Sequence, residues 1–144
     1  MATYRRVKRL KPEIAAYIGG LIDGEGTITL TRMHRHENRR LVVSISNNEL
    51  PMLQFVANSV GTGHISSKRI YSERHAQSFT YQLSSRQALD LIAQIEPHLR
   101  SYKKRRAKLI LDQYLALTPR NGKYSEELLD LRKSFELRLL SITP

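Results

Sequence analysis

The nine residues from Ile18 to Gly26, with the sequence IGGLIDGEG, place two carboxylates at the end of an apolar helix that contains glycine. A helix C-terminus has unpaired carbonyl oxygens and the negative end of the macrodipole, so each acid there costs about 0.3–1 kcal/mol unless a cation or donor compensates. Asp23 and Glu25 therefore predict a positive group nearby. A hard divalent metal ion, held by carboxylate and backbone oxygens, is one candidate.

The same helix carries small residues at helical spacing. Ala16 and Gly20 are four residues apart and share one face, and Ala15 and Gly19 form the neighbouring one. Two such helices approach more closely than helices lined by leucine, and two copies would then bring their Glu25 carboxylates together. Like charges at that separation require bound cations. The alternative is a core helix whose acids begin a solvated turn.

These nine residues resemble the signature of the LAGLIDADG homing endonucleases, position by position. The departures are Ile18 for Leu, Gly19 for Ala, Gly24 for Ala and Glu25 for Asp, all changes between residues of similar size or chemistry. In that family the acid at the eighth position binds the catalytic metal. The resemblance therefore implies that Glu25 is a catalytic residue and metal ligand, helped by the Gly24 carbonyl. It also implies Mg²⁺, with Mn²⁺ able to replace it and Ca²⁺ supporting binding without cleavage.

Charge independently favours a nucleic-acid partner. The 144 residues suit a single domain spanning 1–144, and 24 Lys and Arg against 13 Asp and Glu give a net charge of +11. The bases gather in an N-terminal arm (1–11) and in segments 32–40 and 100–108. Such an excess favours polyanions, with nucleic acid ahead of a membrane surface. Together with this charge, the family resemblance implies double-stranded DNA as the partner.

Two features that the sequence lacks restrict the possible metal ligands and the possible cellular location. The chain has no cysteine, so a metal site must use oxygen and nitrogen ligands. No apolar run approaches the roughly 20 residues that span a bilayer, so no membrane association is expected. With the expected DNA partner, these features agree with an intracellular, DNA-associated protein, and they do not distinguish a bacterial cytoplasm from an organelle.

Hydrophobic periodicity predicts an α+β fold of the order αββαββα followed by C-terminal helices. The signature helix spans 12–24, with Pro12 in its first turn. Strands are expected at 27–31, 40–46, 64–71 and 78–83. One helix, capped by Asn47 or Asn48, is expected to run to about residue 59. Further helices are expected at 85–95, 103–117 and 125–140. The last helix should bury a stripe of Leu128, Leu131, Phe135 and Leu139.

The four strands should form an antiparallel sheet with one face on the helices and one polar face. Strand alternation places hydrogen-bonding and basic side chains on the polar face, which suits base edges and phosphates in a major groove. In the family that the chain resembles, this sheet is a saddle across DNA. An ordinary solvated face is the alternative. The predicted DNA-binding residues are Thr29, Thr31, Arg32, Arg35, Asn38, Arg40, Ser44, Ser46, His64, Ser66, Lys68, Thr80 and Gln82.

Two further catalytic residues are implied by the resemblance. Lys103 opens the segment KKRRA, which is similar to a family segment that carries an active-site lysine. Lys104 is adjacent, so the choice between the two stays open, and the whole run could instead grip phosphate. Asn47 matches a position where relatives keep a polar residue that positions water. Its competing role is to cap the following helix.

One signature and no internal repeat predict a homodimer, because cutting both strands of a duplex takes two active sites. The interface should contain Ala16, Gly19, Gly20 and Asp23, and the target should be nearly palindromic. The resemblance implies a staggered double-strand cut at a long, specific site by an intron-encoded or intein-encoded enzyme. The alternatives are a cleavage-deficient DNA-binding protein of the same fold, an intron-splicing maturase that binds its own intron RNA, and an unrelated basic RNA-binding domain.

Overall fold

The order of helices and strands follows the predicted α+β pattern. The structure, a computed structural model, describes residues 6–67 and 76–144. Its elements are α1 (Pro12–Glu25), β1 (Gly26–Thr31), β2 (Arg40–Asn47), α2 (Leu50–Val60), β3 (His64–Ser67), β4 (Phe79–Ser84), α3 (Ser85–Ile95), the 3-10 helix η1 (Glu96–His98), α4 (Lys103–Gln113) and α5 (Glu126–Ser141). The remainder of the strand predicted at 64–71, including Lys68, lies outside the described residues.

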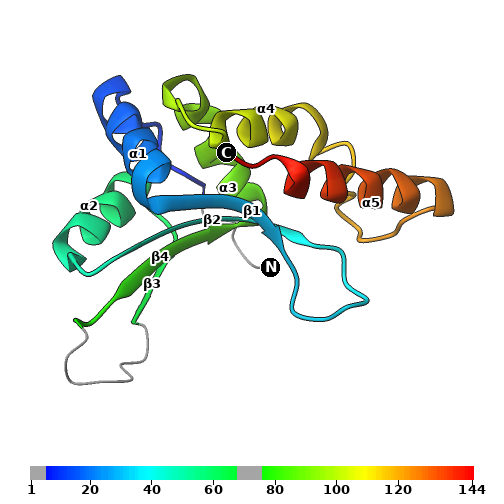
Figure 1. Cartoon of the computed structure of the whole chain (residues 1–144), viewed down its shortest axis with the longest axis horizontal. Helices are drawn as coiled ribbons and strands as arrows, with labels where there is room; N and C mark the ends of the chain where they lie inside the picture. The colour runs from blue at the N-terminus through cyan, green and yellow to red at the C-terminus, as the bar shows by residue number, and fades with distance from the viewer. Residues whose placement is uncertain (1–5, 68–75) are drawn as a thin grey trace.

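The strands form one antiparallel sheet in the order β1-β2-β4-β3. All the helices lie on one side of this sheet, and the opposite face is concave and open (Figure 1). The β1–β2 connection extends from one end of the concave face, far from α1. The predicted four-stranded saddle is therefore confirmed as an architecture.

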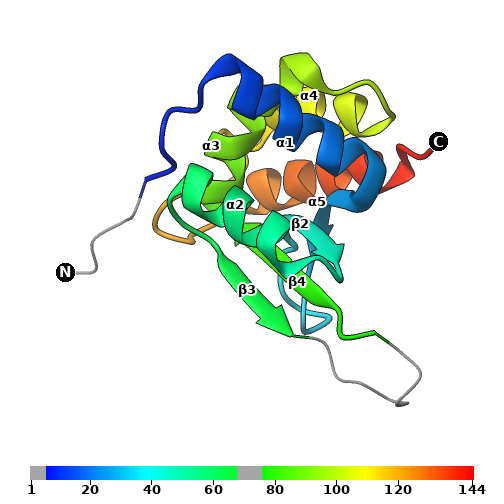
Figure 2. The same cartoon turned by 90° about the vertical axis from the view of Figure 1, so that its left-hand side faces the viewer.

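The core lies between the sheet and the helices. Strand residues of one parity point toward the helices, and they are almost fully buried, as expected of alternating strands. Burying each large aliphatic side chain contributes about 1.5–3 kcal/mol, so this layer dominates the stabilisation. Helices α1 and α3 lie side by side over the sheet (Figure 2) and contribute to the same cluster. Its principal members are Ile18, Ile22, Ile28, Leu30, Leu41, Val43, Ile45, Tyr81, Leu83, Leu91, Ile92 and Ile95.

Helix α4 is shorter than predicted. It ends at Gln113, whereas the periodicity predicted a helix to residue 117. The chain then turns, and the Thr118 hydroxyl donates to the Tyr114 carbonyl oxygen at 2.7 Å. Tyr114 and Leu117 are nonetheless buried, which explains why the apolar pattern continued past the helix.

The buried stripe of α5 was also predicted incorrectly at one position. Leu131 is 53% exposed, whereas Arg132 and Glu136 are 2% and 3% exposed. Phe135 and Leu139 are fully buried, as predicted. The two charged residues occupy core positions because they pair with each other, from Arg132 Nε to Glu136 Oε2 at 2.9 Å. None of the described helices is long and apolar enough to cross a membrane.

Candidate active site and nucleic-acid interface

The last turn of α1 is held by the ammonium group of Lys103. Its Nζ donates to the carbonyl oxygen of Ile22 at 2.8 Å and to that of Asp23 at 3.0 Å. The side chain is almost buried, and it supplies the positive group that the two acids predicted. Lys104 turns away, because its Nζ contacts the Glu96 carbonyl oxygen at 3.0 Å and lies 3.8 Å from the Glu96 carboxylate. The geometry therefore separates the two lysines and places Lys103 at the signature.

The surroundings of Lys103 shift its proton affinity. Burial lowers the pKa of the Lys103 ammonium group, the Asp23 carboxylate raises it and the Arg106 guanidinium lowers it, leaving the pKa below its ordinary value. A lysine with a lowered pKa gives up its proton more readily, which suits a group that exchanges protons with solvent. Burial thus gives Lys103 a lower pKa than that of an exposed lysine.

Asp23 is engaged within the chain. Its carboxylate accepts hydrogen bonds from the backbone N–H of Arg100 at 2.8 Å and of Ser101 at 3.1 Å, and from the Ser101 hydroxyl at 2.5 Å. Burial raises the pKa of this carboxyl, but the three hydrogen bonds and the Lys103 charge outweigh burial, so the pKa lies below its ordinary value. Asp23 was predicted at a dimer interface. In the structure its side chain joins α1 to the segment that carries Lys103, and its place at an interface stays a prediction.

Glu25 and Gly24 are accessible, in contrast to Asp23. Both are exposed at the end of α1, and β1 begins at the next residue, Gly26. A Cβ placed on Gly24 would meet nothing within 4 Å. The turn that Lys103 stabilises therefore presents one carboxylate beside open space. Carboxylate and backbone oxygens are the ligands that hard divalent cations prefer.

The two small-residue faces of α1 differ in their surroundings. Ala15 and Gly19 are buried, and a Cβ on Gly19 would lie 3.2 Å from His98 Cβ. Gly19, predicted at the dimer interface, thus packs α1 against η1 of its own chain, where an added Cβ would be closer to His98 than ordinary van der Waals contact. Ala16 and Gly20 are exposed, and a Cβ on Gly20 would meet nothing within 4 Å.

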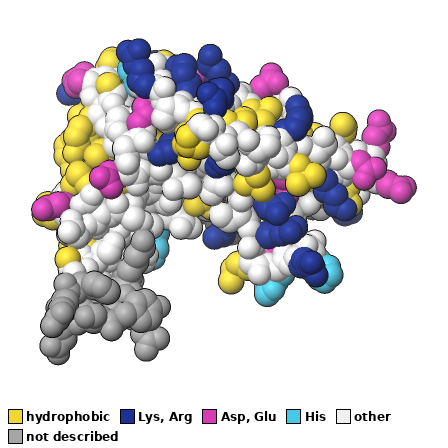
Figure 3. All heavy atoms as spheres, viewed as in Figure 1, with side chains coloured by type: hydrophobic (Ala, Val, Ile, Leu, Met, Phe, Trp, Pro, Cys, Tyr) yellow, Lys and Arg dark blue, Asp and Glu magenta, His cyan; other side chains and the backbone are white. Residues whose placement is uncertain are grey.

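Aromatic residues extend the exposed face of α1 onto α2. The rings of Tyr17 and Phe55 meet edge to face with their centroids 5.7 Å apart. Each residue is 44% exposed. Hydrophobic side chains gather on this side of the molecule (Figure 3), the side on which Figure 1 shows α1 and α2. The result is an apolar surface next to the exposed small residues of α1.

The register of the sheet brings the predicted polar residues together in rows. Ser44 lies opposite both Thr27 and Gln82, and Gln82 lies opposite His64, so one row crosses all four strands. A second row contains Ser46, Thr80 and Ser66, in which the Ser46 and Thr80 hydroxyls are 2.8 Å apart.

Two further pairs on this face join β1 to β2. Thr31 pairs with Arg40, whereas Thr29 pairs with Val42, an apolar residue that is buried. Thr27 was not among the predicted DNA-binding residues. It is exposed, and its place in the β1 alternation was the signal that could have identified it.

The β1–β2 loop, residues 32–39, carries three more of the predicted DNA-binding residues, Arg32, Arg35 and Asn38. Arg32 and Arg35 are exposed, and Arg32 Nη1 donates to the Arg35 carbonyl oxygen at 3.2 Å. Basic side chains are visible on this loop, together with histidines, at the lower right of Figure 3. Asn38 lines a hollow between the loop and α5. A basic loop thus continues the polar face at the end of the sheet away from α1.

Asn47 takes part in the turn before α2. Its Oδ1 accepts from the Glu49 backbone N–H at 2.9 Å, and Glu49 is the residue that precedes α2. The alternative role predicted for Asn47 was to cap α2, but the N-cap residue is Glu49 and no side chain caps the helix, so the predicted cap by Asn47 or Asn48 is wrong. Asn47 instead closes a turn just before the helix. The histidines His34 and His36 are exposed in the β1–β2 loop, with His34 Nε2 4.0 Å from a Glu37 carboxylate oxygen.

Comparison with known proteins identifies the family. The LAGLIDADG endonuclease family matches residues 18–118, well over half of the chain. The chain therefore belongs to the LAGLIDADG endonuclease family. It is an enzyme, a site-specific DNA endonuclease. A search among curated proteins found no match.

Solved structures share the fold. The homing endonuclease I-CvuI, in complex with its target in the presence of calcium, is 17% identical with a TM-score of 0.73 over 92% of this chain and 83% of that chain. The archaeal intron-encoded homing endonuclease I-Vdi141I, complexed with DNA, is 17% identical with a TM-score of 0.69, covering 90% and 84%. The meganuclease I-AabMI, bound to uncleaved DNA, is 16% identical with a TM-score of 0.59, covering 88% of this chain and 44% of that chain.

Proposed function

We propose that the protein is a homing endonuclease that acts as a homodimer and makes a staggered, metal-dependent double-strand cut in a long, nearly palindromic DNA target. The observation that carries the proposal is the end of α1. There an exposed carboxylate, Glu25, follows directly on a helix turn whose carbonyl oxygens bind the buried Lys103 ammonium group. A cation with a lowered pKa beside an accessible acid suits phosphodiester hydrolysis.

The concave face supports DNA binding. Its rows of hydroxyl, amide and imidazole groups can donate to and accept from base edges, and the arginines of the β1–β2 loop can contact phosphates. I-CvuI and I-Vdi141I, which share the fold, are complexes with DNA. Phosphate contacts by several bases predict binding that weakens steeply as salt rises.

The exposed face of α1 supports dimerisation. Ala16, Gly20 and Gly24 follow one another at four-residue spacing on the exposed surface, with open space beside both glycines. Two helices with small residues at such spacing can pack closely. The chain covers 83% of I-CvuI but 44% of I-AabMI, so the longer chain has room for two copies of this fold. Pairing through α1 would bring the two Glu25 residues together.

The residues at this site fit a hard divalent cation. The exposed Glu25 carboxylate and the Gly24 carbonyl of each protomer would hold it, and Mg²⁺ is the ion expected. A bound ion of this kind supplies Lewis-acid stabilisation of the phosphate and of an activated water. Pairing the glutamates would also require such a charge, since two nearby carboxylates repel each other.

The reaction is the hydrolysis of one phosphodiester in each strand. Water attacks phosphorus, the bond from phosphorus to the 3′ oxygen breaks, and a proton reaches the departing oxygen. Lys103 would offset phosphate charge or polarise solvent at this step. Asn47 would position water through its amide nitrogen, while its Oδ1 accepts from the Glu49 N–H. The sheet holds the duplex so that the scissile phosphates lie at the ends of the two α1 helices.

The test is a cleavage selection. The protein is incubated with a randomised plasmid library in Mg²⁺ and, in parallel, in Ca²⁺. Recovery of one family of nearly palindromic sites, cut on both strands in Mg²⁺ and bound but uncut in Ca²⁺, is the expected result. Selective binding without cuts in either ion would instead identify a cleavage-deficient protein of the same fold, and binding to a structured intron RNA would identify a maturase.

A further inference from the structure

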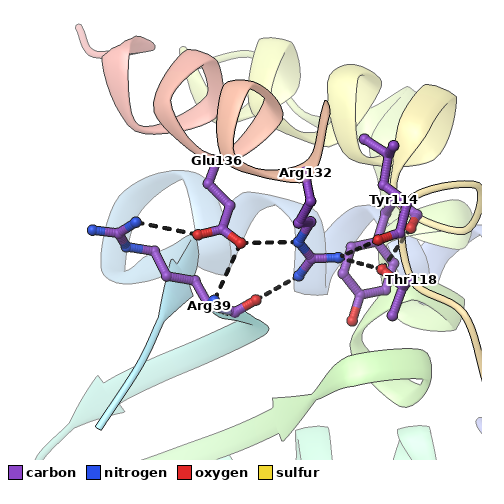
Figure 4. A network of polar contacts seen from close by, with 6 residues as sticks. Arg39, Tyr114, Thr118, Arg132 and Glu136 are labelled. Atoms are coloured by element: carbon purple, nitrogen blue, oxygen red, sulfur yellow. Dashed lines mark hydrogen bonds and ion pairs between the residues drawn. The ribbon is translucent and has the colours of Figure 1, made fainter. Parts of the chain in front are cut away.

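The buried ion pair of α5 clamps the last residue of the β1–β2 loop. Arg132 and Glu136 both reach Arg39, which directly precedes β2 (Figure 4). Glu136 Oε2 accepts from the Arg39 backbone N–H at 3.2 Å, and Oε1 accepts from the Arg39 guanidinium at 3.2 Å. Arg132 Nη2 donates to the Arg39 carbonyl oxygen. Both backbone polar groups of Arg39 are thus bound to α5.

The clamp itself is held from the other side. Arg132 Nη1 donates to the Leu117 carbonyl oxygen at 3.1 Å and to the Thr118 hydroxyl. The guanidinium carbon lies 5.2 Å from the Tyr114 ring centroid and 5.8 Å from that of Phe135, within cation–π range. A buried charged network with its hydrogen bonds satisfied has one preferred geometry, so it is a rigid support.

Arg39 is the point at which the loop returns to the sheet. The β1–β2 ladder ends with Thr31 opposite Arg40, so Arg39 is the first residue outside it. Fixing Arg39 determines the face on which Arg40 lies, because a slip of one residue would exchange the polar and core faces of the strand. It also determines the path by which the exposed Arg32 and Arg35 leave the sheet.

We propose that Arg132 and Glu136 are positioning residues for DNA recognition, which hold the β1–β2 loop in the orientation that reads the outer bases of each half-site. The inference rests on the proposed function. If two copies pair through α1, the loop lies far from the two-fold axis, since Figure 1 shows it at the opposite end of the sheet. The loop would therefore contact bases distant from the cut.

Stability alone does not require this charged pair. Replacing a buried ion pair by well-packed apolar residues of similar volume is often neutral or stabilising. What an apolar pair cannot provide is the set of directional bonds to the Arg39 N–H, carbonyl and guanidinium groups. Replacing both residues by apolar ones therefore removes the hydrogen bonds to Arg39 while it keeps the packing of the core.

The experiment compares the wild-type protein with Arg132→Met/Glu136→Leu. Binding is measured in Ca²⁺ on the target that the wild-type protein selects from the plasmid library, and on every single-base variant of it. We expect a melting temperature close to that of the wild type, at least tenfold weaker discrimination at outer positions, and unchanged discrimination next to the cut. Leu131→Met, an exposed change on the same helix, is the control and should behave as the wild type.

Hydrogen exchange tests the clamp without DNA. Amides at Arg39 and in the preceding loop should exchange at least tenfold faster in the double variant, while those of residues 18–22 in α1 stay protected. A folded double variant with wild-type exchange and wild-type discrimination overturns the proposal. So does loss of cooperative melting in both the double variant and Glu136→Gln, because the pair would then be purely structural. If the wild-type protein selects no target, the proposed function fails, and exchange alone decides whether the pair holds the loop.

Discussion

Replacing Asp23 by asparagine should destabilise the fold without touching the exposed acid. The Asp23 carboxylate accepts two bonds from Ser101 and one from the Arg100 N–H. A hydrogen bond to a charged group contributes about 1.5–3 kcal/mol, but the Arg100 bond is exposed and water can replace it. Asparagine keeps one acceptor oxygen and turns an NH₂ group toward a donor. The expected loss is about 2–3 kcal/mol.

A loss of that size is measurable by thermal unfolding. At about 2–4 °C per kcal/mol for a chain of this size, the melting temperature at pH 7 should fall by about 4–12 °C. The pH dependence has a defined sign. The folded-state pKa of Asp23 is lowered, so its contribution is present above the unfolded pKa of about 3.9 and is lost as pH falls through the folded pKa. The difference between the two proteins should therefore shrink below about pH 4.

The matched control is Glu25→Gln, which changes an exposed acid two residues away. Exposed substitutions usually change stability by less than about 0.5 kcal/mol, so this variant should melt close to the wild type. An Asp23→Asn variant that melts as the wild type does at pH 7, or a difference that persists unchanged at pH 3, would refute the assigned hydrogen bonds.

The remaining predictions concern the reaction, the dimer and the sheet. Lys103→Met should reduce the cleavage rate at least a hundredfold with target binding retained, whereas Lys104→Met should cut at nearly the wild-type rate. Single-turnover kinetics measure both cleavage rates, and equal losses in the two variants would contradict the assignment of Lys103. Gly20→Leu should shift sedimentation toward the monomer at an unchanged melting temperature, because a Cβ at Gly20 meets nothing within 4 Å. Gly19→Leu should lower the melting temperature, because His98 Cβ lies 3.2 Å from the added carbon. The reverse pattern would refute the assigned faces of α1. Arg40→Ala should flatten the salt dependence of DNA binding in a titration, and an unchanged slope would remove Arg40 from the interface.

Much of the fold could be predicted from local patterns. The alternation in β1, β2 and β4 identified which residues lie on the open face, since a strand has a side-chain period of two and the burial of one face fixes its phase. Pro12 correctly marked the first turn of α1. These features depend on neighbouring residues, so the sequence displays them directly.

The errors concern partners that are distant in sequence. Arg132 and Glu136 lie in the core of α5 because Arg39, 97 residues from Glu136, accepts and donates bonds there. The helical spacing of apolar residues cannot reveal such a partner, and it predicted that Leu131 would be buried.

The candidate site shows the same limit. The charges at the end of α1 predicted a compensating cation, and Lys103 provides one. The sequence favoured Lys103 by resemblance but did not decide between it and Lys104. Which of two neighbouring lysines reaches α1 depends on how α4 packs. For the same reason, the buried position of Gly19 against η1 became visible only in three dimensions.

The central claim is that the exposed acid at the end of α1 carries the metal-dependent chemistry. The most direct measurement compares Glu25→Gln with Glu13→Gln, an acid in the first turn of the same helix, on the selected target. The account predicts that Glu25→Gln binds the target in Ca²⁺ with nearly wild-type affinity and cuts neither strand in Mg²⁺, whereas Glu13→Gln binds and cuts normally. Double-strand cleavage by Glu25→Gln at the wild-type rate would contradict it.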